Sequence, residues 1–187
     1  DATVLLLGTG LTMVDYVLSL LRDGHRGPII AMSRRGLLAK PHRRVDAQRI
    51  EEAEIPFGAS ISSLLRWLRL RIDRSVAEGG DWRSVIDGLR PYTQRLWHEL
   101  PPPSKRRFVE HARAWWDVHR HRMAPEVEAR VIQAIHAGQL DLMAAKVISV
   151  APNDDGARVH YRRRGDTRIV STQVGAVVDC TGIVKDP

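Results

Sequence analysis

Residues 3–15 read TVLLLGTGLTMVD, and the order of their parts decides the fold. Residues 3–8 are a short apolar run that ends at a glycine, which is typical of a buried parallel strand. The residues that follow predict an amphipathic helix, because its apolar positions recur at helical spacing: Leu11, Val14, Leu18 and Leu21. A second apolar run, residues 28–32, then ends at SRRG, residues 33–36. Strand, glycine turn, helix and strand in this order predict a βαβ unit.

The rest of the chain changes character twice. Residues 45–138 carry helical patterns, whereas residues 139–187 return to strand-like alternation interrupted by turn residues. The strand-like stretch GAVVD, residues 175–179, is expected to be a buried strand that enters a CTG turn. We therefore predict an α/β fold: a Rossmann-like, three-layer dinucleotide-binding domain with a large all-helical insertion and a β-meander. The single domain 1–187 would comprise a βαβ unit (1–44), the helical insertion (45–138), and the meander with a closing strand (139–187).

Several polar residues and prolines indicate where the helices begin. Asp81 and Ser104 each precede a helical segment and are expected to cap it, and a further helix is expected from Ser60 to about Val76. Pro125 suits the first turn of a further helix, and Gly138 suits the position just beyond its end.

The composition is that of an ordinary globular protein with a basic excess. The 187 residues are 43% hydrophobic, and 29 Lys+Arg against 22 Asp+Glu give a net charge of +7. This excess favours an anionic partner, such as a phosphate-bearing cofactor or nucleic acid. No apolar run is long enough to cross a bilayer, and the lone Cys180 is typical of a reducing compartment, so a cytoplasmic location is expected. Because the chain begins at Asp1 and stops directly after a strand, we expect it to be a fragment of a longer protein.

The glycine turn has the chemistry of a phosphate-binding loop. Gly8 permits a tight turn out of the strand, and Gly10 allows the backbone to approach a pyrophosphate. The following helix directs its positive end at the same point. Met13 replaces the third glycine of the G-x-G-x-x-G fingerprint, but that glycine serves helix packing and not ligand contact. The alternative is a strand–helix turn that needs glycine for geometry alone.

The end of the second strand favours NADP(H) over NAD(H). An NAD site usually carries a carboxylate here for the ribose 2′-hydroxyl, whereas this chain has Ser33, Arg34 and Arg35. Arginine pairs with a 2′-phosphate in a charge-assisted geometry. The alternative is that both arginines are solvated loop charges.

Four stretches together resemble a known group of proteins: GTGLTMVD (8–15), SRRG (33–36), WWDVHRHRMAP (115–125) and VVDCTG (177–182). They are similar to the flavin- and NAD(P)-binding proteins that include bacterial FAD-dependent urate hydroxylase and the aspartate-oxidising enzymes of diazo biosynthesis. A more distant similarity extends to flavin-containing and N-hydroxylating monooxygenases. In such proteins a FAD domain and an NADPH domain are interleaved along one chain.

The resemblance implies that this chain is the NADPH-binding half of a flavin-dependent monooxygenase, which presents NADPH to FAD and acts on a small-molecule substrate. It implies a cofactor site made of Gly8, Thr9, Gly10, Leu11, Thr12, Ser33, Arg34, Arg35, Thr181 and Gly182. No second glycine fingerprint for FAD occurs, so FAD is expected to bind outside this chain, and the catalytic residues stay unassigned. A basic helical nucleic-acid-binding protein and a non-catalytic nucleotide-sensing domain remain as alternatives.

The stretch Trp115–Arg122 does not predict a metal site. His119 and His121 are two residues apart and diverge on a helix, so no metal is expected. One helical face carries His111, Trp115, His119 and Arg122 and could contact a cofactor phosphate or a neighbouring domain. The other interpretation is surface charge above buried tryptophans.

Overall fold

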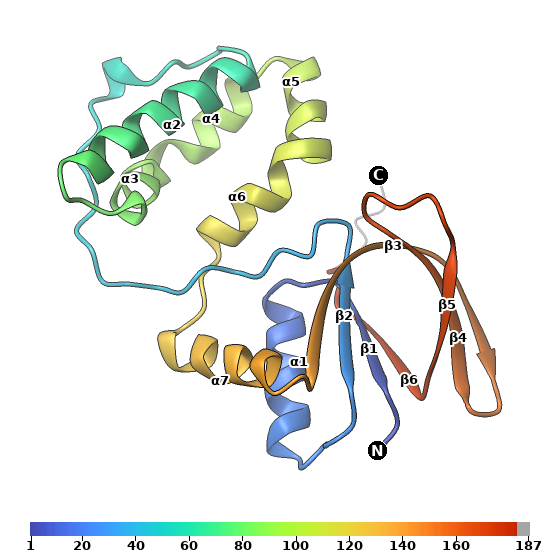
Figure 1. Ribbon diagram of the computed structural model, residues 1–187. Helices are drawn as coiled ribbons and strands as arrows, with labels where there is room; N and C mark the ends of the chain where they lie inside the picture. The colour runs from blue at the N-terminus through green and yellow to red at the C-terminus, as the bar shows by residue number, and fades with distance from the viewer. Residues whose placement is uncertain (183–187) are drawn as a thin grey trace. The chain divides into compact units, whose positions relative to one another are not determined.

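The computed structural model describes residues 1–182, which form two compact units (Figure 1). The first unit comprises Asp1–His42 and the chain from His121 onward, and the second comprises Arg43–Arg120. Where the chain leaves the first unit and returns to it, residues 40–42 pair with Met123: Met123 N donates to Lys40 O (2.9 Å) and His42 N donates to Met123 O (2.6 Å).

A six-stranded mixed sheet with two helices forms the first unit, which confirms the predicted α/β class. The strand order is β5-β4-β3-β2-β1-β6; β3, β2, β1 and β6 pair in parallel, and β4 and β5 continue the sheet antiparallel. The elements are β1 (Val4–Leu7), α1 (Leu11–Arg22), β2 (Ile29–Ser33), α7 (Pro125–His136), β3 (Leu140–Asn153), β4 (Gly156–Arg163), β5 (Val170–Val174) and β6 (Ala176–Asp179).

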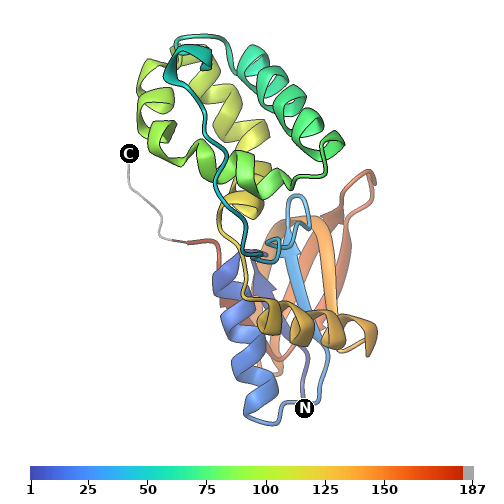
Figure 2. The ribbon, with the colours of Figure 1, turned by 90° about the vertical axis from the view of Figure 1, so that its left-hand side faces the viewer.

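Helices α1 and α7 cover one face of the parallel strands, as Figure 2 shows from the helical side. The buried residues of α1 are Met13, Val14 and Val17, so the expected apolar face is wrong at Leu11, which is 37% exposed. Leu11 is the first helical residue and follows the end of β1, where no strand remains to cover it. Met13, in the place of the fingerprint's third glycine, is fully buried in this core together with Cys180.

The antiparallel strands β4 and β5 cover the other face of the sheet. Residues of β1, β2 and β3 share a second apolar core with Val159, Tyr161 and Val174 of the meander. The sheet therefore curls over itself, and its layers are helices, parallel strands and meander (Figure 1). The predicted burial of the last strand is wrong: Ala176 and Asp179 are exposed because β6 is an edge strand.

The second unit is made of helices. Asp81 caps one of them as predicted, since its side chain accepts from Arg83 N (2.9 Å), and Ser60 caps another by accepting from Ser63 N (3.2 Å). Its apolar core includes Leu68, Val85 and Ile86. The elements are η1 (Glu52–Glu54), α2 (Ile61–Ala77), α3 (Trp82–Gly88), η2 (Arg90–Tyr92), α4 (Thr93–Glu99), α5 (Pro102–Arg107), the π-helical η3 (Phe108–Ala112) and α6 (Arg113–Arg120).

The expected cap at Ser104 is wrong. Helix α5 begins two residues earlier at Pro102, after the N-cap Pro101, and Ser104 lies inside it. The Ser104 side chain is buried, and its hydroxyl accepts from the backbone N–H of Ile61 at 3.1 Å. This hydroxyl therefore supports the first turn of another helix, α2, 43 residues away in the sequence.

Helix α7 has the predicted ends, with Pro125 in its first turn and Gly138 just beyond it at φ 71°. Its buried residues Val131 and Ala134 belong to the core beneath α1, so α7 packs on the sheet and the all-helical unit ends at Arg120. The wider division of the chain into domains stays a prediction. Within residues 1–182 there is no helix whose length and apolar character would allow it to span a membrane.

We expect Met13→Ala to lower the free energy of unfolding by about 2–5 kcal/mol, because it leaves a cavity in a closed core. Leu11→Ala, on the exposed side of the same helix turn, is the matched control and should cost about 0.5 kcal/mol or less. Urea denaturation followed by circular dichroism measures both. Equal losses would show that α1 does not pack through Met13.

Candidate functional site

Three loops meet at the carboxyl edge of the parallel strands. They follow β1 (residues 8–10), β2 (residues 33–36) and β6 (residues 180–182). Leu7, at the end of β1, is paired on one side with Met32 and on the other with Asp179. The chain leaves β1 toward β2 on one side and meets β6 on the other, and ligands of open α/β sheets bind at such a switch point.

The fold itself requires glycine at position 8. Its N–H donates to Met32 O at 2.7 Å, while Cys180 N donates to Leu7 O at 2.7 Å. Its φ is +109°, and an added Cβ would lie 2.7 Å from the Cys180 carbonyl oxygen. Backbone conformation and close approach therefore both exclude a side chain at this position.

Neither backbone conformation nor close approach requires glycine at position 10. Its φ of −83° is available to any residue, and an added Cβ would meet nothing within 4 Å among the described residues. Gly10 is the N-cap of α1, no side chain caps this end, and the first turn carries no acidic residue. The positive end of α1 therefore faces open space at a position where the backbone is bare.

A pair of hydroxyl groups joins the first loop to the second. Thr9 is buried, and its Oγ1 is hydrogen-bonded to Ser33 Oγ at 2.9 Å. Ser33 Oγ also accepts from Gly36 N at 2.9 Å, which closes the turn that carries the two arginines. Ser33 thus holds together the loop predicted to bind the pyrophosphate and the loop whose arginines are predicted to bind the 2′-phosphate.

The two arginines of this turn differ in their surroundings. Arg34 is exposed and makes no hydrogen bond or ion pair with residues 1–182, whereas Arg35 is half-buried and interacts with the rest of the protein. Leu11 and Thr12, which are also predicted site residues, lie exposed in the first turn of α1.

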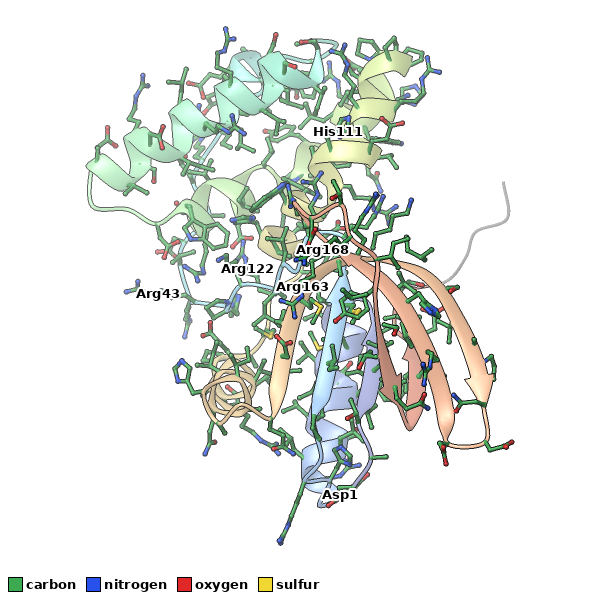
Figure 3. All side chains as sticks on the ribbon, turned by 45° about the vertical axis from the view of Figure 1, so that its right-hand side comes forward. Asp1, Arg43, His111, Arg122, Arg163 and Arg168 are labelled. Atoms are coloured by element: carbon green, nitrogen blue, oxygen red, sulfur yellow. The ribbon has the colours of Figure 1, made fainter. Side chains whose placement is uncertain are left out.

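A second group of arginines lies at the same edge and was missed by sequence reasoning. Strand β4 ends at Arg163, which is paired with Ala145, and Arg164 N donates to Ala144 O at 2.8 Å. Ala144 is itself paired with Ser33. Figure 3 shows Arg163 and Arg168 at the end of the sheet opposite Asp1. The available signal was the run RRRGDTR at residues 162–168, but its position depends on the β3–β4 pairing.

The turn after β6 is fixed by Asp179. Its Oδ1 accepts from both Thr181 N (2.8 Å) and Thr181 Oγ1 (2.6 Å), and Gly182 follows at φ +93°. These bonds, first from the side chain and then from the backbone of Thr181, hold the pKa of Asp179 below its usual range. Burial raises the pKa of the neighbouring Cys180 thiol, and the Asp179 charge adds to this effect.

The predicted face His111, Trp115, His119 and Arg122 is not continuous, because His111 lies in the π-helical η3 and α6 ends at Arg120. His119 packs edge-to-face on Trp82 (centroids 4.8 Å apart), and its Nδ1 donates to Trp115 O at 2.7 Å. Trp115 is exposed, so the alternative of buried tryptophans is wrong for it. Among residues 1–182, His, Cys, Asp and Glu side chains do not gather into a group of three that could hold a metal ion.

No protein-family model matches the chain, and none of the curated proteins matches it. Among solved structures, L-lysine 6-monooxygenase from Pseudomonas syringae is similar to 98% of this chain, with 15% identity and a TM-score of 0.53. The reduced form of ornithine hydroxylase (PvdA) from Pseudomonas aeruginosa is similar over 97%, with 14% identity and a TM-score of 0.49. The ornithine N-hydroxylase KtzI of Kutzneria sp. 744, with reduced FAD, NADP+ and L-ornithine, is similar over 96%, with 15% identity and a TM-score of 0.49.

These matches cover only 36%, 36% and 35% of the three structures, so the chain spans little more than a third of their length. At such low identity the likeness to the lysine monooxygenase shows the fold alone. The expected similarity to N-hydroxylating monooxygenases is confirmed at this level. The closer similarity expected to urate hydroxylase and the diazo-biosynthesis enzymes stays a prediction.

We expect Thr181→Val to raise the pKa of Asp179 toward its ordinary value, because the substitution removes the hydroxyl donor. Because the folded pKa is depressed, the bonds to Asp179 stabilise the turn above the ordinary carboxyl pKa of about 3.9 and are lost as the pH falls through the folded pKa. NMR titration of the Asp179 carboxyl measures the change. Thr172→Val on β5 is the control, and an unchanged titration in Thr181→Val would contradict the assignment.

Proposed function

We propose that the first unit is the NADPH-binding module of a flavin-dependent oxidoreductase of the monooxygenase type. The observation that carries the proposal is Gly10, whose bare backbone faces open space at the uncapped start of α1. A dinucleotide pyrophosphate needs backbone N–H groups, a positive helix end and the absence of a side chain at one point. Gly10 combines all three, and nothing in the described protein requires glycine there.

The pyrophosphate would lie against the backbone of Gly8–Thr12. The N–H groups of the first turn of α1 donate to phosphate oxygens, and the helix end stabilises their charge. Thr9 would not turn toward the ligand in this arrangement, because its buried hydroxyl is bonded to Ser33. Its role is to hold the phosphate loop against the loop that follows β2.

The ribose 2′-phosphate would lie beside Arg34 and Arg35. Arg34 supports this assignment because its guanidinium has no protein partner within residues 1–182. Arg163 and Arg164 add positive charge at the same edge through the pairing of Ala144 with Ser33. An arginine fork matches phosphate geometry, and no carboxylate occurs between Asp23 and Asp46 to select NAD(H) instead. We therefore propose NADP(H) as the preferred cofactor.

The nicotinamide would extend toward the turn at Thr181 and Gly182, which follows the neighbouring strand β6. Bound NADPH supplies the hydride, and a flavin held by sequence outside this chain would receive it. The contribution of this chain is to bind, orient and select the cofactor. The oxygenated substrate would be a small molecule, in keeping with the lysine monooxygenase whose fold the chain shares.

The charge of the helical unit does not favour the nucleic-acid alternative. At least seven of its fourteen arginines form ion pairs with carboxylates, among them Arg71 with Glu54, Arg83 with Asp81, and Arg95 with Glu52 and Glu99. Paired arginines contribute little of the unscreened positive surface that phosphate backbones require.

Replacing Arg34 and Arg35 together by Ala should weaken NADPH binding by about 10- to 100-fold, because charge-assisted bonds to the 2′-phosphate are lost. NADH binding should change by less than about threefold. Titrations of each nucleotide by calorimetry measure both constants. Arg26→Ala, at the opposite edge of the sheet before β2, controls for a simple loss of positive charge.

The titrations test the nucleotide site and the 2′-phosphate assignment separately. Absence of binding by either nucleotide in the unaltered chain would refute a nucleotide site. Equal weakening of NADPH and NADH in the double variant would refute the 2′-phosphate assignment alone.

Gly10→Ala should weaken NADPH binding at least about tenfold while lowering the free energy of unfolding by no more than about 1 kcal/mol. The methyl group meets no protein atom within 4 Å but occupies the space assigned to the phosphates. Gly8→Ala should lower the free energy of unfolding by more than Gly10→Ala does, because its methyl group strains the backbone against Cys180. Unaltered NADPH affinity in Gly10→Ala would place the phosphates elsewhere.

A further inference from the structure

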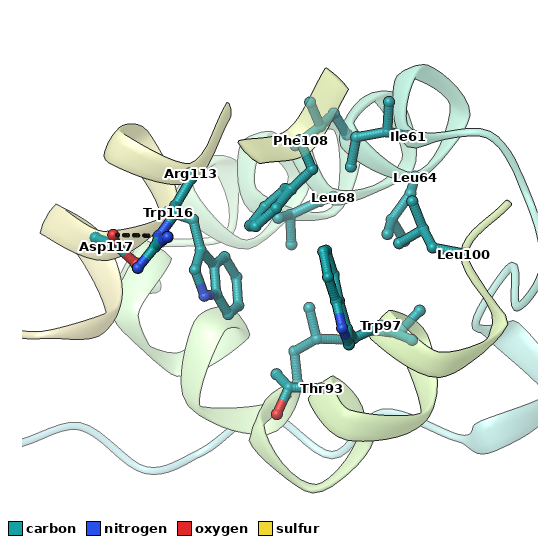
Figure 4. A pocket seen from close by; sticks show the side chains of 13 residues that line it. Ile61, Leu64, Leu68, Thr93, Trp97, Leu100, Phe108, Arg113, Trp116 and Asp117 are labelled. Atoms are coloured by element: carbon teal, nitrogen blue, oxygen red, sulfur yellow. Dashed lines mark ion pairs between the residues drawn. The ribbon is translucent and has the colours of Figure 1, made fainter. Parts of the chain in front are cut away.

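The helical unit contains an apolar cavity of about 300 Å³, all of it lined by residues of that unit (Figure 4). This volume falls at the lower end of the range for small-molecule sites, which are mostly apolar clefts with few polar groups. Its walls come from α2, α4, η3 and α6 and from residues adjoining them: Ile61, Leu64, Leu65, Leu68, Leu89, Thr93, Leu96, Trp97, Leu100, Phe108, Arg113, Trp116 and Asp117.

Three aromatic rings from different helical elements line this cavity. Figure 4 shows Trp97, Phe108 and Trp116 around the space. Trp97 and Phe108 are in edge-to-face contact, with ring centroids 5.8 Å apart. Rings arranged in this way offer both faces and edges to a further aromatic group, which prefers offset or edge-to-face contact.

The two charged side chains of the cavity are paired with each other, and its threonine hydroxyl is bonded to the backbone. Thr93 Oγ1 donates to Arg90 O at 2.9 Å, and the Arg113 guanidinium forms an ion pair with Asp117, with Nε and Oδ2 3.5 Å apart. An ionised ligand would therefore lose hydration without gaining an unpaired partner of opposite charge. The lining therefore disfavours charged ligands.

Two irregular features build the cavity in advance of any ligand. The buried Ser104 hydroxyl binds Ile61 N and fixes the start of α2 against α5. Phe108 is the first residue of the π-helical segment, so the irregular turn contributes a ring to the cavity. Short π-helical turns are uncommon and frequently occur at functional sites.

From these observations we propose that the helical unit binds a small, uncharged aromatic molecule in this cavity, independently of the NADPH site. The ligand class follows from the apolar lining, the three rings and the mutually neutralised ion pair. The binding free energy comes from removal of apolar surface from water and from ring contacts with Trp97, Phe108 and Trp116.

Isothermal titration of the full chain with indole tests the site directly. We expect saturable binding with one site and a Kd below about 1 mM. Indole-3-carboxylate, the same ring with a charged group, should bind at least about tenfold more weakly. Absence of saturation with indole would overturn the proposal, and equal binding of the carboxylate would overturn the selection against charge.

A pair of substitutions on α2 locates the site. Leu64→Trp fills the cavity and should abolish indole binding, whereas Leu70→Trp adds the same side chain at an exposed position of the same helix and should leave it unchanged. If circular dichroism shows that Leu64→Trp does not fold, the smaller change Leu65→Phe takes its place with Leu70→Phe as control. Equal indole affinity in the filled and control variants would overturn the location. NADPH affinity, measured in parallel, should not change in any of them.

Discussion

The confinement of Gly8 between two strand ends is the constraint on which the carboxyl edge of the sheet depends. Its N–H is bonded to the end of β2, and the carbonyl of Cys180 after β6 approaches it so closely that a side chain cannot fit. The left-handed turn that results directs the chain away from β1 and into α1. The direction of this helix, the position of Thr9 beside Ser33 and the placement of the last turn all follow from one residue without a side chain.

Local patterns in the sequence were sufficient where neighbouring residues decide the structure. The glycine turn between an apolar run and a periodic helix predicted β1, α1 and β2. The cap at Asp81 could be predicted because a cap is a local interaction. Ser104 had the same local appearance, yet its hydroxyl serves Ile61 in another helix. The π-helical turn that begins at Phe108 contains no glycine or proline from which it could be predicted, so we attribute it to packing within the helical unit.

In the candidate site, too, the local features could be predicted and the long-range ones could not. Gly8, Gly10 and the arginines after β2 could be recognised because the phosphate-loop pattern is contiguous in sequence. What separates the two glycines is visible only in three dimensions: one is enclosed by Cys180, and the other faces open space. The arginines at the end of β4 were not predicted, because the register that brings Ala144 beside Ser33 joins segments more than 100 residues apart.

The position of β1 between β2 and β6 has a consequence for how the protein is made. β2 emerges from the ribosome soon after β1, but β6, which pairs Ala176 with Val4, emerges only after the helical unit and the meander. The helical unit is continuous in sequence and can complete its contacts early, as domains generally do during synthesis. The apolar strand VLLL meanwhile keeps an unpaired edge, the kind of surface that promotes association between chains. Although β1 precedes the other described strands of this sheet, its second edge is therefore paired only when β6 has been synthesised.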